Sequence, residues 1–238
     1  MLRGIWAYFV LTLATVFFGL PVVLFAPFLP RWTAFPTRMA RGWSRVMLFI
    51  LGARTTYHDP HGALQQSRCI YIANHQSNVD IWVLGKVMPL GTCFVVKQEL
   101  FRVPVLGPAM KAAGFIRINR SNRSEAIRSL TQAAESIRAG RPVILFPEGT
   151  RSKDGRLQPF KKGAFHLAMR AGVPVVPVAI RGTFEIMPPK SVRVRSGPVE
   201  VFFEKPIELG EPASMDAHEL LRAVHKTISD RLARNPES

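Results

Sequence analysis

The clearest architectural signal in this chain is the stretch Cys69-Ile70-Tyr71-Ile72-Ala73-Asn74-His75-Gln76-Ser77-Asn78-Val79-Asp80, in which an apolar run passes into a polar segment. A short apolar run of this kind is typical of a buried strand. His75 and Asp80 follow it, five residues apart. On one continuous helix this spacing would place their side chains roughly 140° apart. Direct contact between them therefore requires a turn, as at a junction between a strand and a helix.

His75 and Asp80 have two interpretations when this stretch is considered alone. Imidazole has a pKa near neutrality and can accept a proton from a hydroxyl group at pH 7. A carboxylate on its other ring nitrogen would fix the tautomer and stabilise the imidazolium. Alternatively, Ser77 to Asp80 reads as a capping box that starts a helix, and His75 is then an ordinary loop histidine. The remainder of the chain must decide between them.

Strand-like and helical patterns alternate beyond residue 54, which predicts an α/β fold: a mixed sheet flanked by helices. The expected strands are Arg54–His58, Cys69–Ala73, Thr92–Lys97, Phe115–Ile118, Pro142–Phe146, Val173–Ile180, Val192–Ser196 and Val199–Glu204. The last two are separated by Gly197-Pro198, a turn dipeptide. The expected helices follow Asp80, run from Asn122 to Gly140 and from about Lys161 to Ala171, and close the chain over Met215–Ala233.

Composition indicates a basic protein with an apolar segment. The 238 residues include 32 Lys and Arg against 16 Asp and Glu, which gives a net charge of +16. This balance predicts polyanionic partners: nucleic acid, an anionic membrane surface, or phosphorylated and CoA-like substrates. The two cysteines, Cys69 and Cys93, lie in apolar runs and are expected to be buried free thiols, so no oxidising compartment is implied.

The N-terminal segment from Gly4 to Pro30 carries no formal charge. As one straight helix it would span about 40 Å, against about 30 Å for the hydrocarbon core of a bilayer. Pro21 is expected to interrupt it, which leaves a marginal span or a bent hairpin entering one leaflet. A buried core helix is an alternative. A cleaved signal peptide is disfavoured, because no small-x-small cleavage site follows a short apolar run.

The segment that follows supports a membrane location. It is rich in arginine, and no acidic residue precedes Asp59. The basic residues are Arg31, Arg38, Arg41, Arg45 and Arg54. Residues 37–52 place apolar and basic side chains on different helical faces, as in a helix that lies on anionic lipid. We expect residues 1–53 to anchor the chain at the cytoplasmic face of the inner cell membrane and residues 54–238 to form the α/β domain.

Two further segments carry chemistry-bearing residues. Gly114-Phe115-Ile116-Arg117-Ile118-Asn119-Arg120 is a short strand with Arg120 just beyond its end, where the guanidinium can bind phosphate or remain solvated. Phe146-Pro147-Glu148-Gly149-Thr150-Arg151-Ser152 follows a buried-type strand. In this segment, Glu148 can accept a hydrogen bond from a substrate hydroxyl, and Arg151 can form an ion pair with a phosphate group. An ordinary turn with a surface ion pair is the alternative.

One more apolar segment, and the absence of several known catalytic and binding motifs, bear on the fold and the chemistry. Val173-Pro174-Val175-Val176-Pro177-Val178 contains two prolines, which predicts an edge or bulged strand; it is either plain core or the wall of an acyl-chain groove. The sequence has no G-x-S-x-G elbow, phosphate loop, dinucleotide fingerprint or Cys/His metal spacing. Without an evident nucleophile, a His/Asp pair would most simply deprotonate a substrate hydroxyl, which then attacks an activated acyl group.

Taken in order, N-H-Q-S-N-V-D, G-F-I-R-I-N-R, F-P-E-G-T-R-S and V-P-V-V-P-V resemble the four sequence blocks of the glycerophospholipid acyltransferase family. The closest likeness is to the bacterial 1-acylglycerol-3-phosphate acyltransferases. The resemblance implies an α/β acyltransferase fold with an N-terminal hydrophobic helical motif on the membrane. It also implies that His75 is the catalytic base and that Asp80 orients it.

The same resemblance assigns the substrate-binding residues, which are Lys97 (in a K-x-E-L motif), Arg120, Glu148, Gly149, Thr150 and Arg151. Arg117 departs from the family pattern, because its position is often aromatic or aliphatic. It either adds a phosphate contact or points to solvent.

The implied reaction transfers a fatty acyl group from acyl-CoA or acyl carrier protein to the 2-hydroxyl of 1-acyl-sn-glycerol-3-phosphate (lysophosphatidic acid), giving phosphatidic acid. No metal, cofactor or nucleic acid is expected; the partners are the two substrates, the anionic membrane and, as one donor, acyl carrier protein. Three alternatives stay open. The acceptor is another lysolipid, such as lyso-ornithine lipid or lysophosphatidylglycerol; the chain is a non-catalytic basic protein that binds membrane or nucleic acid; or it is a hydrolase.

Overall fold

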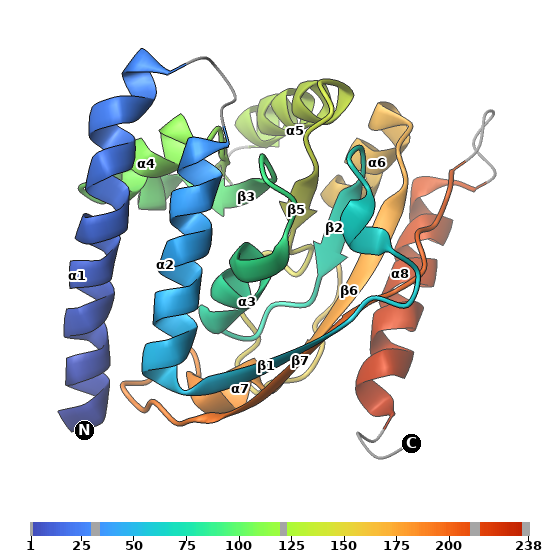
Figure 1. Cartoon of the computed structure of the whole chain (residues 1–238). Helices are drawn as coiled ribbons and strands as arrows, with labels where there is room; N and C mark the ends of the chain where they lie inside the picture. The colour runs from blue at the N-terminus through green and yellow to red at the C-terminus, as the bar shows by residue number, and fades with distance from the viewer. Residues whose placement is uncertain (1, 30–33, 120–122, 210–214, 235–238) are drawn as a thin grey trace.

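The computed structural model describes residues 2–29, 34–119, 123–209 and 215–234, and it has a seven-stranded sheet with helices on both faces (Figure 1). The strand order is β1-β7-β6-β2-β5-β3-β4. Five neighbouring strands, from β6 to β4, are parallel, whereas β7 is antiparallel to β6 and β1 runs with β7. The mixed α/β sheet expected from the sequence is therefore confirmed. The strands are β1 (Ala53–His58), β2 (Ile70–Ala73), β3 (Cys93–Lys97), β4 (Ile116–Ile118), β5 (Val143–Leu145), β6 (Val175–Arg181) and β7 (Gly197–Phe203).

Helices cover the two faces of the sheet in separate groups. α1, α2 and α3 share one hydrophobic core with the sheet, and α5, α6 and α8 share the other. In β2, Tyr71 contributes to the first core, whereas Ile70 and Ile72 contribute to the second. Burial on both faces explains why the strand reads as an uninterrupted apolar run. The helices are α1 (Leu2–Phe25), α2 (Phe35–Leu51), α3 (Val79–Val87), α4 (Leu106–Ala112), α5 (Arg123–Arg138), α6 (Gly163–Ala171), α7 (Thr183–Ile186) and α8 (Ala217–Ala233), with short 3-10 turns η1 (Ala26–Phe28), η2 (Ala63–Gln65) and η3 (Gln98–Arg102).

The expected strand over Val192–Ser196 is wrong. This segment is not a strand; it passes beside α7, where the Arg195 amide donates a hydrogen bond to the Ile186 carbonyl (2.9 Å). Gly197-Pro198 is not a turn either, because both residues belong to β7 and pair with Ala53 and Arg54 of β1. Pairing with β1 extends β7 at its N-terminal end to include these two residues. This pairing is a tertiary contact, and the local sequence does not reveal it.

β6 is a central strand, so the expected edge position is wrong. It lies between β7 and β2. The alternative of a bulged strand is consistent with the pairing. Val175 pairs with Ile207 and Val178 pairs with Phe203, so the partner chain has one more residue between these two pairs than β6 has. Pro177 lies inside this irregular stretch, where its carbonyl accepts the Glu204 amide (3.0 Å) and a ladder donor is not required. All residues of β6 from Val175 to Ile180 are buried, which favours plain core over a groove wall.

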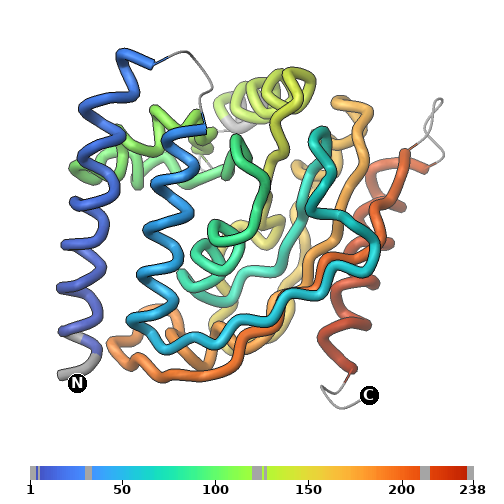
Figure 2. Tube along the Cα trace, viewed as in Figure 1, coloured from blue at the N-terminus to red at the C-terminus, as the bar shows by residue number. Residues whose placement is uncertain are grey.

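The N-terminal helix α1 continues through Pro21, so the expected interruption is wrong. α1 and α2 lie side by side as an antiparallel pair, and α1 also packs against α4 (Figures 1 and 2). Gly19 and Val22, on either side of Pro21, face α2 and α4, so tertiary packing offsets the backbone hydrogen bond that proline removes. Among the described residues one stretch, Trp6–Phe28, is long and apolar enough to cross a membrane, and only 17% of it is buried.

The division into residues 1–53 and 54–238 stays a prediction. α1 and α2 contribute Ala14 and Met47 to the same core that holds Trp82 of α3. Arg31 and Pro30 lie outside the described residues.

Candidate active site

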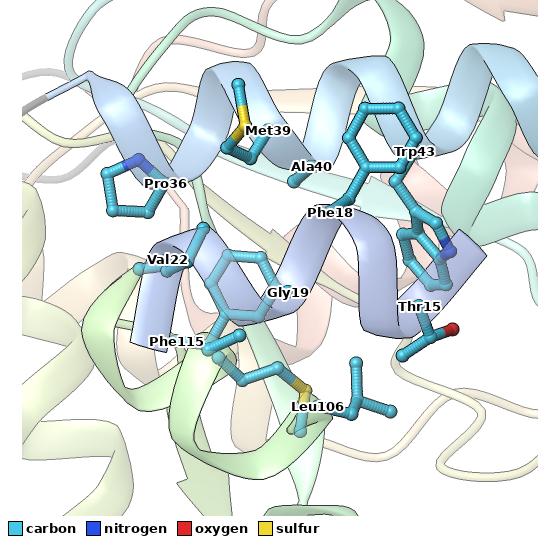
Figure 3. Close-up of a pocket in the computed structure, with 13 residues that line it drawn as sticks. Thr15, Phe18, Gly19, Val22, Pro36, Met39, Ala40, Trp43, Leu106 and Phe115 are labelled. Carbon is cyan, nitrogen blue, oxygen red and sulfur yellow. The ribbon is translucent and has the colours of Figure 1, made fainter. Parts of the chain in front are cut away.

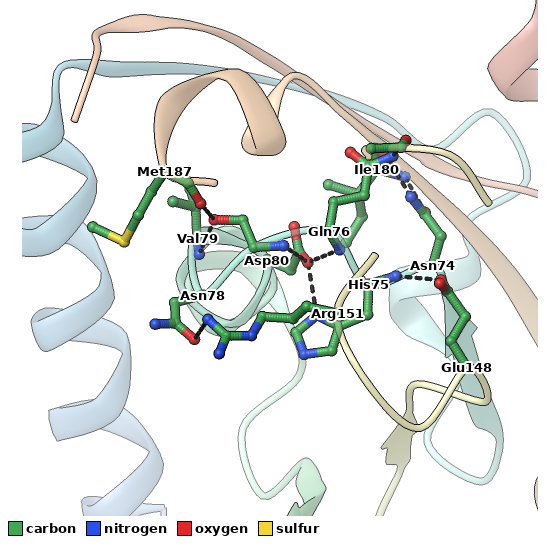
Figure 4. A network of polar contacts seen from close by, with 12 residues as sticks. Asn74, His75, Gln76, Asn78, Val79, Asp80, Glu148, Arg151, Ile180 and Met187 are labelled. Atoms are coloured by element: carbon green, nitrogen blue, oxygen red, sulfur yellow. Dashed lines mark hydrogen bonds and ion pairs between the residues drawn. The ribbon is translucent and has the colours of Figure 1, made fainter. Parts of the chain in front are cut away.

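The candidate site lies at the carboxyl edge of the parallel strands, where ligands of open α/β sheets bind. His75 follows the end of β2, and Glu148 follows the end of the neighbouring strand β5. Lys97 is the last residue of β3, the next strand along. The topology thus gathers residues from three sequence segments at one edge of the sheet. Figure 4 shows the polar contacts around His75.

His75 and Asp80 are in direct contact. The His75 Nδ1 and Asp80 Oδ2 atoms are 2.8 Å apart, because the chain turns between β2 and α3 as the spacing requires. Asp80 is fully buried, and the same oxygen accepts the backbone amides of Gln76 (2.7 Å) and Ser77 (2.8 Å). The Ser77 hydroxyl in turn accepts the Val79 amide (3.2 Å). Only one half of the expected capping box forms: Asp80 accepts the Ser77 amide, whereas the Ser77 hydroxyl accepts the Val79 amide in place of the Asp80 amide, and α3 follows Asn78 without a side-chain cap.

The imidazole ring is fixed in orientation on two sides. The Asp80 carboxylate forms a hydrogen bond with Nδ1. The ring stacks on Phe146, with the two ring centroids 4.1 Å apart and the ring planes inclined by 20°. A carboxylate on Nδ1 favours the tautomer that carries its proton there. His75 Nε2 then has its lone pair available, since the only side-chain hydrogen bond of His75 to another described residue is made through Nδ1. The side chain keeps 14% of its surface exposed, which leaves a path for a substrate.

Glu148 supports the backbone of His75. Its Oε1 accepts the His75 amide (2.7 Å), a contact between residues 73 positions apart in the sequence. Burial raises the pKa of Glu148 to about 7, because the charged carboxylate is poorly solvated there. Glu148 thus binds a backbone amide, not a substrate hydroxyl, through this oxygen.

Gly149, Thr150 and Arg151 form the turn after Glu148. Gly149 has φ +76°, a left-handed conformation that glycine adopts without strain. Thr150 is exposed, and Arg151 Nη1 donates to the Asn78 Oδ1 atom (2.9 Å) at the start of α3. This contact places the Arg151 guanidinium beside the loop that carries His75 (Figure 4).

The remaining expected binding residues are less well defined. Lys97 is exposed and forms an ion pair with Glu99 (3.5 Å) in the K-x-E-L motif. Arg120 lies outside the described residues. Arg117 is exposed on β4, as expected for a residue that points to solvent. Binding roles for Lys97 and Arg120 stay predictions.

Two residues of the first block hold the site together in ways that the sequence did not indicate. Asn74 is buried at the end of β2 and bridges to β6: its Nδ2 donates to the Ile180 carbonyl (2.9 Å) and its Oδ1 accepts the Ile180 amide (2.7 Å). Gln76 Nε2 donates to the Gly155 carbonyl (2.8 Å). Asn74 and Gln76 flank His75 in the sequence, but their distant partners leave no local signal.

An apolar pocket opens between α1, α2 and α4 (Figure 3). Trp43 of α2 forms one wall, and its ring meets Trp82 of α3 edge-on with centroids 5.8 Å apart. The lining residues are Thr15, Phe18, Gly19, Val22, Pro36, Met39, Ala40, Trp43, Leu106, Ala109, Met110, Ala113 and Phe115. A pocket of this composition suits a hydrocarbon chain.

Cysteine and metal chemistry find no support in the described part of the chain. Cys69 and Cys93 are buried free thiols, as expected, and burial raises the pKa of Cys69 to about 12 and that of Cys93 to about 11. Such thiols are poor nucleophiles. No group of three His, Cys, Asp or Glu residues with metal-binding geometry occurs among the residues that the structure covers.

Comparisons with known proteins point in one direction. A family model described as Acyltransferase matches residues 54–181. The 1-acyl-sn-glycerol-3-phosphate acyltransferase of Haemophilus influenzae is 32% identical over 196 residues, which cover 82% of this chain and 81% of that protein. The protein of the same name from Cocos nucifera is 36% identical over 195 residues.

A solved structure shows the same architecture. The 1-acyl-sn-glycerophosphate (LPA) acyltransferase PlsC from Thermotoga maritima superposes with a TM-score of 0.83 at 25% identity, over 99% of this chain and 97% of that one. The matched region spans 62% of the coconut protein and 40% of a chloroplast relative from Brassica napus, less than two thirds of either.

Proposed function

Because the chain belongs to the acyltransferase family, we propose that it transfers a fatty acyl group from an acyl thioester to the 2-hydroxyl of 1-acyl-sn-glycerol-3-phosphate. The observation that carries this proposal is the buried contact between His75 Nδ1 and Asp80, which leaves Nε2 to act as a base at the carboxyl edge of the sheet. The names of the relatives support lysophosphatidic acid as the acceptor.

In the proposed mechanism, His75 Nε2 removes the proton of the acceptor hydroxyl as its oxygen attacks the thioester carbonyl. The tetrahedral intermediate collapses, the carbon–sulfur bond breaks, and the imidazolium returns its proton to the departing thiolate. Asp80 stabilises the imidazolium between these two proton transfers. Arg151 binds the acceptor phosphate, together with Lys97 and Arg120, as the family resemblance implies. No covalent enzyme intermediate is required.

The proposed location is the cytoplasmic face of a membrane. Large apolar side chains are exposed on both N-terminal helices, with Phe17 of α1 72% and Phe49 of α2 86% exposed. Basic side chains on α2 complement anionic lipid. The pKa of Arg41 is lowered mainly by burial and, to a smaller extent, by the positive charges of Arg45 and Arg38. The pocket between α1, α2 and α4 offers an apolar site for an acyl chain.

The test measures the free thiol that the purified chain releases from an acyl donor, either acyl-CoA or acylated acyl carrier protein. The reaction is run in anionic vesicles with a panel of lysolipid acceptors. We expect release that depends on lysophosphatidic acid, with one phosphatidic acid formed per thiol. Release without any acceptor would indicate a hydrolase, and preference for another lysolipid would change the acceptor. If the chain bound membrane or nucleic acid in a way that weakened with salt, and consumed no thioester, it would be a non-catalytic binding protein.

A further inference from the structure

The side chain of Lys161 lies across the turn that carries Glu148. A Cβ atom built on Gly149 would be 2.9 Å from Lys161 Nζ and 3.0 Å from its Cε. The Lys161 amide also donates to the Pro147 carbonyl (2.9 Å), which ties this residue to the turn. Gly149 therefore serves two purposes: it permits the left-handed backbone, and it leaves room for an ammonium group against the chain.

The Lys161 amine has no hydrogen bond or ion pair within the described part of the chain, although it lies against a turn of the candidate site. Two positions after Gly149 in the sequence, Arg151 donates from Nη1 to Asn78 Oδ1 and has no other partner among the described residues. Asp154, the next acidic residue along the chain, accepts the Ser152 hydroxyl (2.9 Å) instead. Among the described residues, neither the Lys161 amine nor the Arg151 guanidinium forms an ion pair with a carboxylate.

A pair of cations complements a phosphate monoester better than the other acceptor head groups. A phosphate monoester has a charge of about −1.5 to −2 at pH 7 and three acceptor oxygens. The phosphodiester of lysophosphatidylglycerol has a single negative charge, and a monoacylglycerol has none. Arg151 can bind phosphate through its planar fork and Lys161 as a point charge, so their combination favours the doubly charged head group.

We propose that Lys161 binds the acceptor phosphate together with Arg151 and selects lysophosphatidic acid over lysolipids with a lower charge. This inference rests on the proposed acyltransferase function, and it adds a residue outside the four sequence blocks. Lys162, the next residue, provides a matched control. It is also an exposed lysine, and it precedes α6, where its carbonyl accepts the Phe165 and His166 amides (3.1 Å each).

The experiment compares Lys161→Met with Lys162→Met. Methionine keeps an unbranched stem across Gly149 and removes the charge, so we expect both variants to unfold at the temperature of the wild type. For Lys161→Met we expect the KM for lysophosphatidic acid to rise about 10- to 100-fold, because one charge-assisted hydrogen bond to the substrate is lost. We expect kcat to change less than about threefold. Turnover of monoacylglycerol should not change, and Lys161→Arg should restore most of the selectivity.

A binding measurement separates this inference from the proposed function. Titration with glycerol 3-phosphate should show about 10- to 100-fold weaker binding to Lys161→Met than to the wild type, whether or not acyl transfer occurs. If the wild type binds but releases no thiol, the proposed function fails and the phosphate site stands. Equal binding by the wild type and Lys161→Met, or an equal loss in Lys162→Met, would overturn the role of Lys161.

Discussion

Replacing Asp80 by Asn tests the role of the buried carboxylate without removing its shape. Asp80 Oδ2 accepts three donors, His75 Nδ1 and the amides of Gln76 and Ser77. An Asn oxygen in this place can keep all three hydrogen bonds, so the turn should persist. What disappears is the negative charge opposite the imidazolium that forms during the reaction.

The size of the effect follows from the 2.8 Å separation. At an effective dielectric constant of about 20, two unit charges at this distance interact by roughly 6 kcal/mol. The Asn dipole and local relaxation recover part of it, so we expect the barrier to rise by about 3 to 5 kcal/mol. This corresponds to a loss of about 10²- to 10⁴-fold in kcat.

The assay is acceptor-dependent thiol release at saturating lysophosphatidic acid, with urea unfolding measured in parallel. Asp154→Asn is the control, since Asp154 is an exposed carboxylate that bonds to Ser152. Asp80→Ala should behave differently, because it also leaves the buried Gln76 and Ser77 amides without an acceptor and costs roughly 1–3 kcal/mol of stability for each. A folded Asp80→Asn enzyme with kcat within threefold of the wild type would refute the reasoning.

Two further predictions concern stability. The Glu148 pKa is about 7 in the folded chain against about 4.5 when unfolded, so between these pH values the unfolded state releases a proton that the folded state keeps. The free energy of unfolding should therefore fall by up to about 3 kcal/mol as pH rises from 4.5 to 7 and then level off, and Glu148→Gln should remove this component. Urea unfolding at pH 5 and 7.5 measures it, and an equal pH dependence in both proteins would contradict the prediction. Asn74→Ala leaves the buried Ile180 amide and carbonyl without their partner, and we expect a loss of about 2–4 kcal/mol in urea unfolding. A loss below about 1 kcal/mol would show that water or backbone movement replaces these bonds.

The sequence predicted those elements whose structure is set by local pattern and two-sided burial. The strands β2 and β5 read as apolar runs because helices cover both faces of the sheet. The turn between His75 and Asp80 also followed from sequence, since their spacing excludes contact on one helix. Local signals failed where a distant partner decides the outcome. Pro21 lies within a helix that packs against neighbouring helices, and Pro177 lies within an irregular stretch of a central strand.

The same limit applies to the candidate site. The family blocks indicated His75, Asp80 and Glu148, but the contact that joins Glu148 to the His75 amide spans 73 residues and has no sequence signal. Lys161 lies outside the blocks, and only the fold shows that its amine lies against Gly149.

The central claim is that His75 acts as the base that activates the acceptor hydroxyl. The most direct test compares the rate of phosphatidic acid formation by His75→Ala with that of the wild type, with His61→Ala as a control in an exposed turn. General-base catalysis contributes about 10²- to 10⁴-fold, so we expect His75→Ala to lose at least about a hundredfold in kcat while it remains folded and bound to vesicles. His61→Ala should retain full activity. A folded His75→Ala variant that forms phosphatidic acid at the wild-type rate would contradict the claim.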